Sequence, residues 1–336
     1  MIITVGDLVT DVLAVLRAPL ATGSDTPATV HLSGGGQAAN TAAWIAWLGR
    51  PVTFVGAVGD DLAGGDRLAE LRAAGVHTQV SIRPGASTGS IVVLAYQGER
   101  TMISDRGANL LLSPSDVDSA IAMGATHLHL SGYTLLDQAS RPAGRAALAS
   151  AKSAGLRTSV DAASAAPLAA LTTRQPPAYP TPSAHAPPSA YAARSAHVTG
   201  SAGAAAASQT GPNEPDANFL EWVHGVDLLI ANADEAQALV GLADPAEQAA
   251  TLARAIGGSA VVKLGPRGAL WAGPEGVLHV PIEPAHVVDA TGAGDAFAAG
   301  LIAALDAGAD IREALHEGCR LGAQAVGQVG ARPPLR

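Results

Sequence analysis

Short apolar runs rich in β-branched residues alternate along this chain with longer stretches rich in alanine and leucine, and this alternation limits the possible folds most strongly. The first such pairs are residues 2–5 with 39–48, 53–58 with 62–73, and 127–130 with 139–154. Alternation of this kind favours βαβ units and a mainly parallel sheet. Later runs at 158–160, 226–231 and 260–264 are apolar throughout, as in strands covered on both faces. We therefore predict an α/β fold.

Two segments interrupt the alternation of strands and helices. One is residues 29–32, and the other is a pair of short runs within 88–103 that Gln97-Gly98-Glu99 joins like a hairpin turn. We predict a small β-lid built from segments at about 12–33 and 87–104. An antiparallel edge of the main sheet is the alternative.

The composition changes to proline, alanine, serine and threonine between residues 163 and 216. A segment of this composition cannot bury enough apolar surface to fold alone. The sequence has the same character on both sides of it, so we expect a surface insertion and no domain boundary. The prediction is a single domain over 1–336 with a disordered insertion at about 164–217.

Charge and cysteine content exclude several classes of partner. The net charge is -9 at pH 7, and the sequence has no stripe of Lys and Arg residues, so we expect no nucleic-acid partner. No apolar run approaches the roughly 18 residues that span a bilayer, so we expect no membrane span. The single cysteine, Cys319, cannot form an intramolecular disulfide. A reducing, cytoplasmic location is the simplest expectation.

A glycine-rich turn near the C-terminus ends in an aspartate, Asp289-Ala290-Thr291-Gly292-Ala293-Gly294-Asp295, and a helical stretch follows it. Glycines let N–H groups converge at a helix N-terminus, where a partial charge of roughly half an elementary unit favours an anion. A carboxylate in the first helical turn can take a proton from an attacking hydroxyl group beside such an anion hole. Asp295 is the predicted base. A helix cap is the other role for an aspartate here.

A second glycine-rich turn, Gly34-Gly35-Gly36-Gln37-Ala38-Ala39-Asn40, opens an early helix. The amide of Asn40 both donates and accepts hydrogen bonds, which suits the hydroxyl groups of a polyol. These glycines follow the first strand by about thirty residues, unlike a dinucleotide fingerprint, and no P-loop motif occurs. Dehydrogenases and P-loop NTPases are therefore disfavoured. A purely structural glycine turn is the alternative.

Two further patterns follow predicted buried strands. Asn232 and Glu235 are three residues apart at a helix start and share a face. Such a pair suits the water molecules of a hydrated Mg²⁺, and it also fits a helix capping box. Residues 261–268, Val-Val-Lys-Leu-Gly-Pro-Arg-Gly, form a strand that runs into a glycine turn. Nucleotides often lie against such a turn.

In this order the four motifs resemble the ribokinase-like (PfkB-type) carbohydrate kinase family, and the resemblance covers almost the whole chain outside the insertion. It implies a three-layer Rossmann-like α/β sandwich with a mainly parallel central sheet. It also implies a β-lid over the sugar, through which two copies can form a homodimer. Gly35, Gly36 and Asn40 then contact sugar hydroxyl groups together with an aspartate at the end of the first strand. Asp11 is that aspartate, and Asp7 is the competing candidate.

For the nucleotide the resemblance implies a second set of residues. Asn232 and Glu235 lie near magnesium and phosphate, with Glu235 acting on Mg²⁺ through water, and the nucleotide lies against Lys263, Gly265 and Gly268. Gly292, Ala293 and Gly294 form the anion hole beside the base Asp295. In many members a potassium ion lies near the loop that corresponds to Asp289 and Thr291, where the Gly330-Ala331 turn can complete its cage.

The implied activity is transfer of the γ-phosphate of ATP to a hydroxyl group of a small sugar of the ribose, fructose or keto-deoxy type. One alternative is a nucleoside kinase of the same family, for which Trp44, Tyr96 and Tyr133 are the few aromatic side chains available to hold a base. Another is a catalytically silent protein that binds sugar or nucleotide. A phosphorylated sugar needs cations, for which Arg100 and Arg106 are candidates. We expect both on the surface, and the prediction is a neutral sugar.

Two departures from the family pattern limit what the resemblance says about the substrate. The long insertion is unlike most members, and Val9 stands where relatives that bind ribose often carry a polar residue. Ribose is therefore one option among several.

Overall fold

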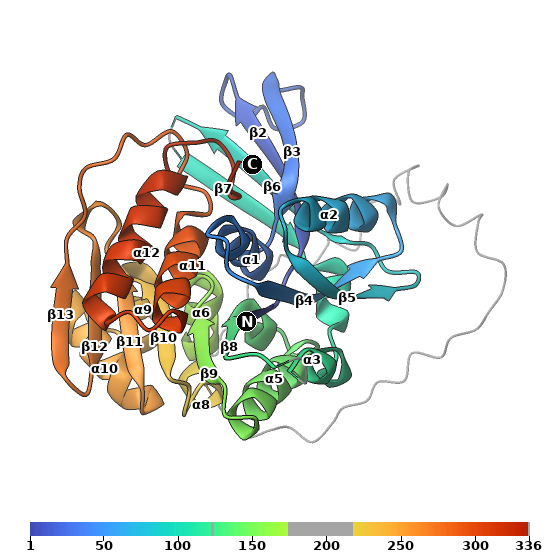
Figure 1. Cartoon of the computed structure of the whole chain (residues 1–336). Coiled ribbons are helices and arrows are strands. Elements are labelled where there is room, and N and C mark those ends of the chain that lie inside the picture. The colour runs from blue at the N-terminus through green and yellow to red at the C-terminus, as the bar shows by residue number, and fades with distance from the viewer. Residues whose placement is uncertain (98, 122–123, 174–217, 335–336) are drawn as a thin grey trace.

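Strands and helices alternate along the computed structural model as predicted, and the model describes residues 1–97, 99–121, 124–173 and 218–334 (Figure 1). The strands are β1 Ile2–Val5, β2 Val9–Leu16, β3 Ala28–Gly35, β4 Val52–Gly59, β5 His77–Arg83, β6 Gly89–Tyr96, β7 Glu99–Asp105, β8 His127–Ser131, β9 Arg157–Asp161, β10 Leu228–Asn232, β11 Ser259–Lys263, β12 Ala269–Gly273 and β13 Gly276–Val280. The α-helices are α1 Gln37–Trp47, α2 Leu62–Ala73, α3 Pro114–Ile121, α4 Tyr133–Leu136, α5 Arg141–Ser153, α6 Ala165–Thr173, α8 Phe219–Trp222, α9 Ala233–Val240, α10 Pro245–Ile256, α11 Ala293–Asp306 and α12 Ile311–Ala325. Two 3₁₀ turns are η1 Gly107–Leu111 and η2 Gly265–Arg267.

The central sheet has nine strands within the described residues, in the order β13-β12-β11-β10-β9-β8-β1-β4-β5. From β11 to β5 all neighbours are parallel, while β12 and β13 pair antiparallel at one edge. The carboxyl ends of the parallel strands therefore meet along one side of the sheet, where ligands bind in open α/β folds.

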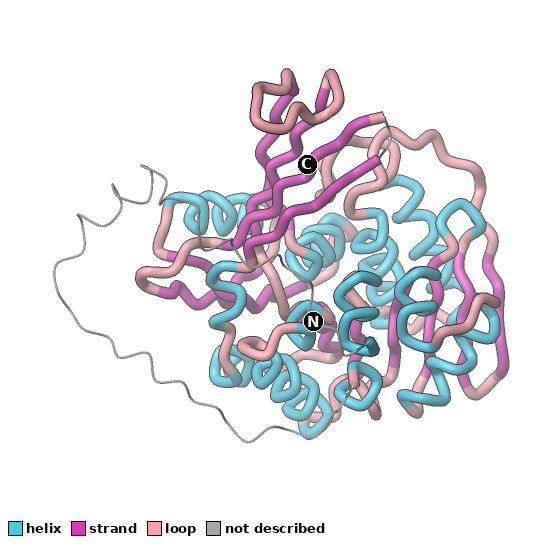
Figure 2. Tube along the Cα trace, turned by 180° about the vertical axis from the view of Figure 1, so that it is seen from behind, coloured by secondary structure: helices cyan, strands magenta, loops and turns pink. Residues whose placement is uncertain are grey.

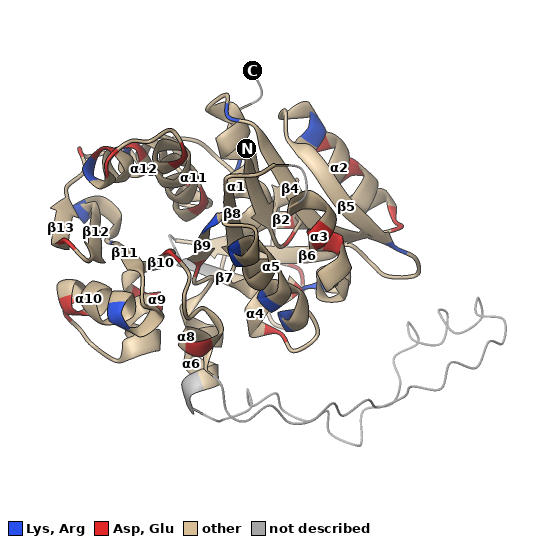
Figure 3. Cartoon of the chain, turned by 60° about the horizontal axis from the view of Figure 1, so that its bottom comes forward, with Lys and Arg blue, Asp and Glu red and all other residues tan. Residues whose placement is uncertain are grey.

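Alternate residues of the central strands face opposite helix layers, because successive side chains of a strand point to opposite faces. Leu228 and Ile230 of β10 belong to the core with α1, α2, α11 and α12. Leu229 and Ala231 belong to the core with α3, α5, α8, α9 and α10. Figure 3 shows the strands between these two layers. The predicted three-layer sandwich is confirmed.

A second sheet of four described strands, in the order β3-β2-β6-β7, stands apart from the central sheet (Figures 1 and 2). In it β2 pairs antiparallel with β3 and parallel with β6, and β6 forms the predicted hairpin with β7. The small second sheet is confirmed, and the alternative of an edge of the main sheet is wrong. Its role as a lid stays a prediction.

The predicted insertion at about 164–217 starts too early. Residues 165–173 form helix α6, and its Leu168 is buried against the core under α3, α5 and α8. Alanine and leucine in this stretch favour a helix, and its single proline, Pro167, lies in the first turn, where a helix tolerates proline. The rest of the predicted insertion, 174–217, lies outside the described residues. No helix among the described residues has both the length and the apolar character of a membrane span.

Candidate active site

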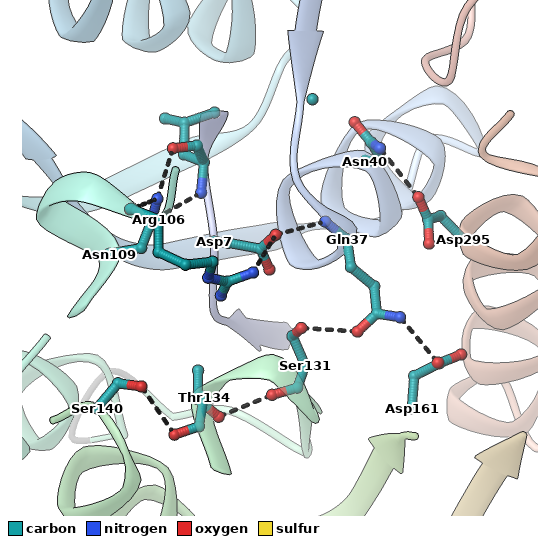
Figure 4. A network of polar contacts seen from close by, with 12 residues as sticks. Asp7, Gln37, Asn40, Arg106, Asn109, Ser131, Thr134, Ser140, Asp161 and Asp295 are labelled. Atoms are coloured by element: carbon teal, nitrogen blue, oxygen red, sulfur yellow. Dashed lines mark hydrogen bonds and ion pairs between the residues drawn. The ribbon is translucent and has the colours of Figure 1, made fainter. Parts of the chain in front are cut away.

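The two predicted glycine-rich motifs meet in space, although about 255 residues separate them. Asn40 lies in the first turn of α1 and Asp295 in the first turn of α11, and these helices share one core. Nδ2 of Asn40 donates a hydrogen bond to Oδ2 of Asp295 at 2.9 Å (Figure 4). Burial raises the pKa of Asp295 well above its usual range. A carboxylate of raised basicity therefore faces the proposed sugar-binding amide.

The turn before Asp295 has the conformation that its glycines predict. Gly292 has φ of 75°, in the left-handed region, and is the N-cap residue of α11. Ala293 and Gly294 line a cavity, whereas Gly292 packs against Ala331, which a Cβ at Gly292 would approach to 2.5 Å. The N–H groups of a helix's first turn have no partner within the helix. The turn can therefore present donors to an anion in the cavity, with Gly292 shaping it from behind.

The cavity has a volume of about 470 Å³ and brings together all five residues predicted for the nucleotide. These are Asn232, Glu235, Lys263, Gly265 and Gly268. Asp295 and Gln37 also line it, together with apolar side chains such as Ile282, Phe297 and Val326. A cavity lined by both polar and apolar side chains suits a ligand that has a charged part and an apolar part.

Asn232 and Glu235 form a capping box at the start of α9. Oε2 of Glu235 accepts from the backbone N of Asn232 at 2.7 Å, and the Asn232 side chain accepts from the backbone N of Glu235 at 2.8 Å. Burial raises the pKa of Glu235. The spacing alone could not separate a capping box from a magnesium pair. The structure shows the box, and its carboxylate also lines the cavity.

A polar chain that the sequence did not predict connects the cavity to the centre of the sheet. Nε2 of Gln37 donates to Oδ1 of Asp161 at 2.8 Å (Figure 4). Nζ of Lys263 donates to Oδ2 of the same carboxylate at 2.8 Å. Burial alone would lower the pKa of Lys263, but the carboxylates of Asp161 and Glu235 outweigh it and raise that pKa. A Cβ on Gly294 would lie 3.1 Å from the Lys263 ammonium nitrogen. A fixed cation thus lies beside the glycine turn.

The two candidate aspartates of the N-terminal segment occupy different places. Asp11 was expected at the end of the first strand, and that prediction is wrong. The chain turns after Val5 and begins a second strand at Val9, so Asp11 lies within β2 of the small sheet. It contacts Gly35, whose added Cβ would come within 2.2 Å of Asp11 Oδ2. Burial raises the pKa of Asp11 to about 6.

Asp7 follows β1 directly and is buried. Its Oδ2 accepts from the backbone N of Gln37 at 3.2 Å and lies 3.8 Å from Nη1 of Arg106 (Figure 4). Arg106 also lies over the ring of Tyr133 at 4.5 Å. Both aspartates therefore lie beside the second glycine turn: Asp7 fixes the start of α1 through Gln37, and the side chain of Asp11 packs against Gly35.

The loop from Asp289 to Thr291 is tied to the C-terminal turn. Oδ1 of Asp289 accepts from the backbone N and Oγ1 of Thr291 at 2.9 and 2.7 Å, and Oδ2 accepts from the backbone N of Gly330 at 3.0 Å. The predicted proximity of this loop to Gly330 is present. Among the described residues no cluster of three or more His, Cys, Asp and Glu side chains could hold a metal ion.

Sequence reasoning also missed Arg332, which follows the C-terminal turn. Its Nε donates to Oδ1 of Asn40 at 3.2 Å, and its Nη2 donates to the backbone O of Gly35 at 3.1 Å. No local pattern around Arg332 points to a site. By contrast, Asp161 could have been found, because it directly follows the predicted strand 158–160, at the edge of a parallel sheet where ligands bind.

The family to which the chain belongs is shown by comparison with known proteins. The family described as "pfkB family carbohydrate kinase" matches residues 1–185 and 186–336. The chain is similar to the ATP-dependent ribose-1-phosphate kinase of Halopiger xanaduensis, at 28% identity over 95% of this chain and 89% of the relative. It is also similar to the 2-dehydro-3-deoxygluconokinase of Thermoproteus tenax, at 30% identity over 89% and 81% of the two chains.

Solved structures share the fold. The adenosine kinase of Sinorhizobium meliloti superposes with a TM-score of 0.76 at 26% identity, covering 99% of this chain and 95% of that one. A putative ribokinase II from E. coli, in complex with ATP and Mg²⁺, has a TM-score of 0.75 at 23% identity over 98% and 94% of the chains. The chain belongs to the pfkB family of carbohydrate kinases, as its motifs predicted. It is a phosphotransferase that acts on an alcohol group of a sugar.

Proposed function

We propose that this kinase transfers the γ-phosphate of ATP to a hydroxyl group of a small sugar, with Asp295 as the base. The observation that carries the proposal is the position of Asp295 between two sites. On one side it lines the cavity that holds the nucleotide-binding residues, and on the other it accepts a hydrogen bond from Asn40. A group that removes a proton from the acceptor must lie at this boundary.

The reaction follows from what surrounds Asp295. The acceptor hydroxyl is oriented by Asn40 and Asp11 and gives its proton to Asp295 as its oxygen attacks the γ-phosphorus. A new O–P bond forms, the bond from the γ-phosphorus to the β,γ-bridging oxygen breaks, and ADP leaves. In this proposal the turn of Ala293 and Gly294, which lines the cavity, and the ammonium of Lys263 beside it stabilise the negative charge of the transferring group.

Two features support ATP and Mg²⁺ as the co-substrate and cofactor. The relative from Halopiger is named as ATP-dependent, and the E. coli structure contains ATP and Mg²⁺. The buried Glu235 carboxylate lines the cavity, so Glu235 and Asn232 fit a hydrated Mg²⁺ held through water. Held there, Mg²⁺ would neutralise part of the negative charge of the phosphates. We also propose a K⁺ ion at the Asp289–Thr291 loop, because that loop and the Gly330 turn already meet around one carboxylate.

The proposed function is tested by ADP release over a panel of pentoses, hexoses, keto-deoxy acids, phosphosugars and nucleosides, run in potassium chloride and in lithium chloride. Release with a sugar is the expected result, and release that is larger in potassium supports the K⁺ site. Release with nucleosides alone would favour the nucleoside kinase. No release with any acceptor would favour the silent binding protein and overturn the proposal.

The raised pKa of Asp295 predicts opposite effects of pH on activity and on stability. A base must be ionised, so kcat/KM is expected to fall as the pH is lowered through the raised pKa. The folded chain holds protons on Asp295 and Asp11 that the unfolded chain releases near its ordinary pKa of 3.8. The contribution of Asp11 to the free energy of unfolding is therefore lost as the pH rises from about 4 to 6. The contribution of Asp295 is lost as the pH rises through the raised pKa of that group.

Rate profiles and chemical denaturation from pH 4 to 8 check both effects. The expected result is that activity rises where stability falls. Activity that is constant across this range would contradict Asp295 as a base of raised pKa.

We also propose that two copies pair through the outer face of the small sheet. Laterally paired residues of a sheet share a face. The register β3-β2-β6-β7 places one apolar row on the face opposite Asp11, namely Leu32, Val12, Val92 and Ile103. Leu32 is 71% and Ile103 58% exposed. Exposed apolar patches of this kind mark interaction surfaces.

Replacing Leu32 by aspartate is expected to convert a dimer into a monomer, because a charge would be buried in the interface. His31→Asp is the matched control, since His31 is exposed on the same strand and points to the other face. Sedimentation velocity distinguishes the 33.4 kDa monomer from the dimer. Dimerisation of the Leu32→Asp variant with unchanged affinity would contradict this interface.

A further inference from the structure

Arg332 lies among the residues that we propose to bind the acceptor. Its guanidinium group donates to the side chain of Asn40 and to the backbone of Gly35. A Cβ on Gly34 would lie 2.1 Å from Nη1 of Arg332, so the group also covers that glycine. Asn40 in turn bonds the base, Asp295. The side-chain amide of Asn40 thus connects the guanidinium group to the proposed base through two hydrogen bonds.

The backbone that carries Arg332 is anchored at several points. The indole N–H of the buried Trp44 donates to the backbone O of Ala331 at 2.9 Å. Ala331 is buried and packs against Gly292, and the backbone N of Gly330 donates to Asp289. On the other side, Gln328 donates to the backbone O of Arg332 at 2.9 Å. The fold therefore holds this arginine in place, although it comes from the C-terminal segment.

Arg332 shares its ion-pair partner with a second guanidinium group. Its side chain is 13% exposed, and its ion pair within the described residues is with Oε2 of Glu70 at 3.3 Å. Glu70 is itself 42% exposed and also pairs with Arg67 at 2.5 Å, so two guanidinium groups share one carboxylate. Burial and the neighbouring charge of Arg67 lower the pKa of Arg332 to about 10, against the attraction of Glu70, Asp11 and Asp295.

The remaining acceptors of Arg332 are weak ones for a charged donor. Asn40 offers a neutral amide oxygen and Gly35 a backbone carbonyl. A hydrogen bond from a cation to an anion is roughly twice as strong as one between neutral groups, and a guanidinium fits a phosphate or a carboxylate with two parallel bonds. An oxyanion that enters here would replace both acceptors and release the oxygen of Asn40 for a sugar hydroxyl group.

We propose that Arg332 selects the acceptor by binding an anionic group, a phosphate or a carboxylate, on the sugar. The inference rests on the proposed sugar kinase function and deepens it. It replaces the prediction of a neutral sugar, which considered only Arg100 and Arg106 as cations. Arg106 contacts Asp7 and the ring of Tyr133, and the side chain of Arg100 lies outside the described residues.

The test compares matched acceptors with wild-type protein and with variants of Arg332. The pairs are ribose 1-phosphate with ribose, and a 2-keto-3-deoxy sugar acid with fructose. For wild type, kcat/KM is expected to be at least about tenfold higher for the anionic member of one pair, and the pair concerned distinguishes phosphate from carboxylate. Arg332→Gln is expected to lower kcat/KM for that acceptor by about 10- to 100-fold, and for its neutral partner far less.

Two further variants separate recognition from structure. Arg332→Lys keeps the charge and loses the planar fork, so it is expected to restore part of the preference even where Arg332→Gln folds poorly. Arg320→Gln removes an exposed arginine of α12 that pairs with Glu317, and it is expected to leave both acceptors unchanged. Thermal unfolding of each variant shows whether it is folded.

Equal losses for charged and neutral acceptors in folded variants would show a merely structural role and overturn the inference. Wild-type preference for the neutral member of both pairs would also overturn it, while leaving the kinase function in place. No turnover with any acceptor is a different result, because it would overturn the proposed function and this inference together.

Discussion

Replacing Asp295 by asparagine is expected to lower kcat by about 10² to 10⁴-fold, the usual contribution of a general base. Asparagine has the same shape and can still accept from Nδ2 of Asn40, so the loss isolates proton removal from geometry. ATP binding is expected to persist, because the variant leaves unchanged the five cavity residues that we propose for the nucleotide. Steady-state ADP release and calorimetric ATP titration measure the two quantities.

The same variant is expected to be more stable than the wild type, and by a larger margin at pH 8 than at pH 5. Ionising a buried carboxyl group is unfavourable, and asparagine removes that cost. Asp66→Asn on the exposed surface of α2 is the matched control and is expected to change neither property. Turnover of the Asp295→Asn variant within tenfold of wild type would show that another group removes the proton.

Replacing Gly292 by alanine is expected to lower the free energy of unfolding by about 2–4 kcal/mol, from left-handed strain and from overpacking together. Its φ is 75°, and the new Cβ would lie 2.5 Å from the backbone Cα and O of Ala331. Backbone atoms of the anchored C-terminal turn cannot move away cheaply. We also expect a loss of activity, because Gly292 shapes the turn that presents N–H groups to the phosphate.

Gly308→Ala is the matched control for this prediction. Gly308 has φ of 90° at the end of the same helix and has open space around it, so only the conformational cost applies there. That cost is about 1 kcal/mol. Denaturant unfolding of both variants measures the difference. Equal losses at the two positions would show that contact with Ala331 does not constrain the turn.

The fold and much of the candidate site could be predicted from the sequence, because the alternation of strands and helices indicates the fold and short motifs at helix starts indicate the site. The glycines before Asp295 and before Asn40 lie at helix starts that the alternation of strands and helices had already placed. The two turns then meet because α1 and α11 cover the same face of the sheet. The five residues predicted for the nucleotide line one cavity for a related reason, since β10 and β11 end side by side.

The features that sequence reasoning missed depend on tertiary contacts. Arg332 lies 292 positions along the chain from Asn40, and its place is set by the contacts of the preceding Ala331 with Trp44 and Gly292. Asp11 was expected to end the first strand, because an apolar run interrupted by polar residues does not show where one strand stops and another begins. Whether Asn232 and Glu235 form a capping box or hold Mg²⁺ is likewise decided by side-chain geometry that their spacing leaves open.

The central claim is that Asp295 directs the γ-phosphate of ATP onto a sugar oxygen. Phosphorus NMR of a mixture of ATP, Mg²⁺ and the best acceptor of the panel follows the phosphorus atom itself. We predict a new phosphate-ester resonance that grows with ADP in the presence of wild-type protein and fails to appear over the same time with the Asp295→Asn variant. Formation of ADP with inorganic phosphate only, or of the ester at the same rate in both samples, would contradict the account.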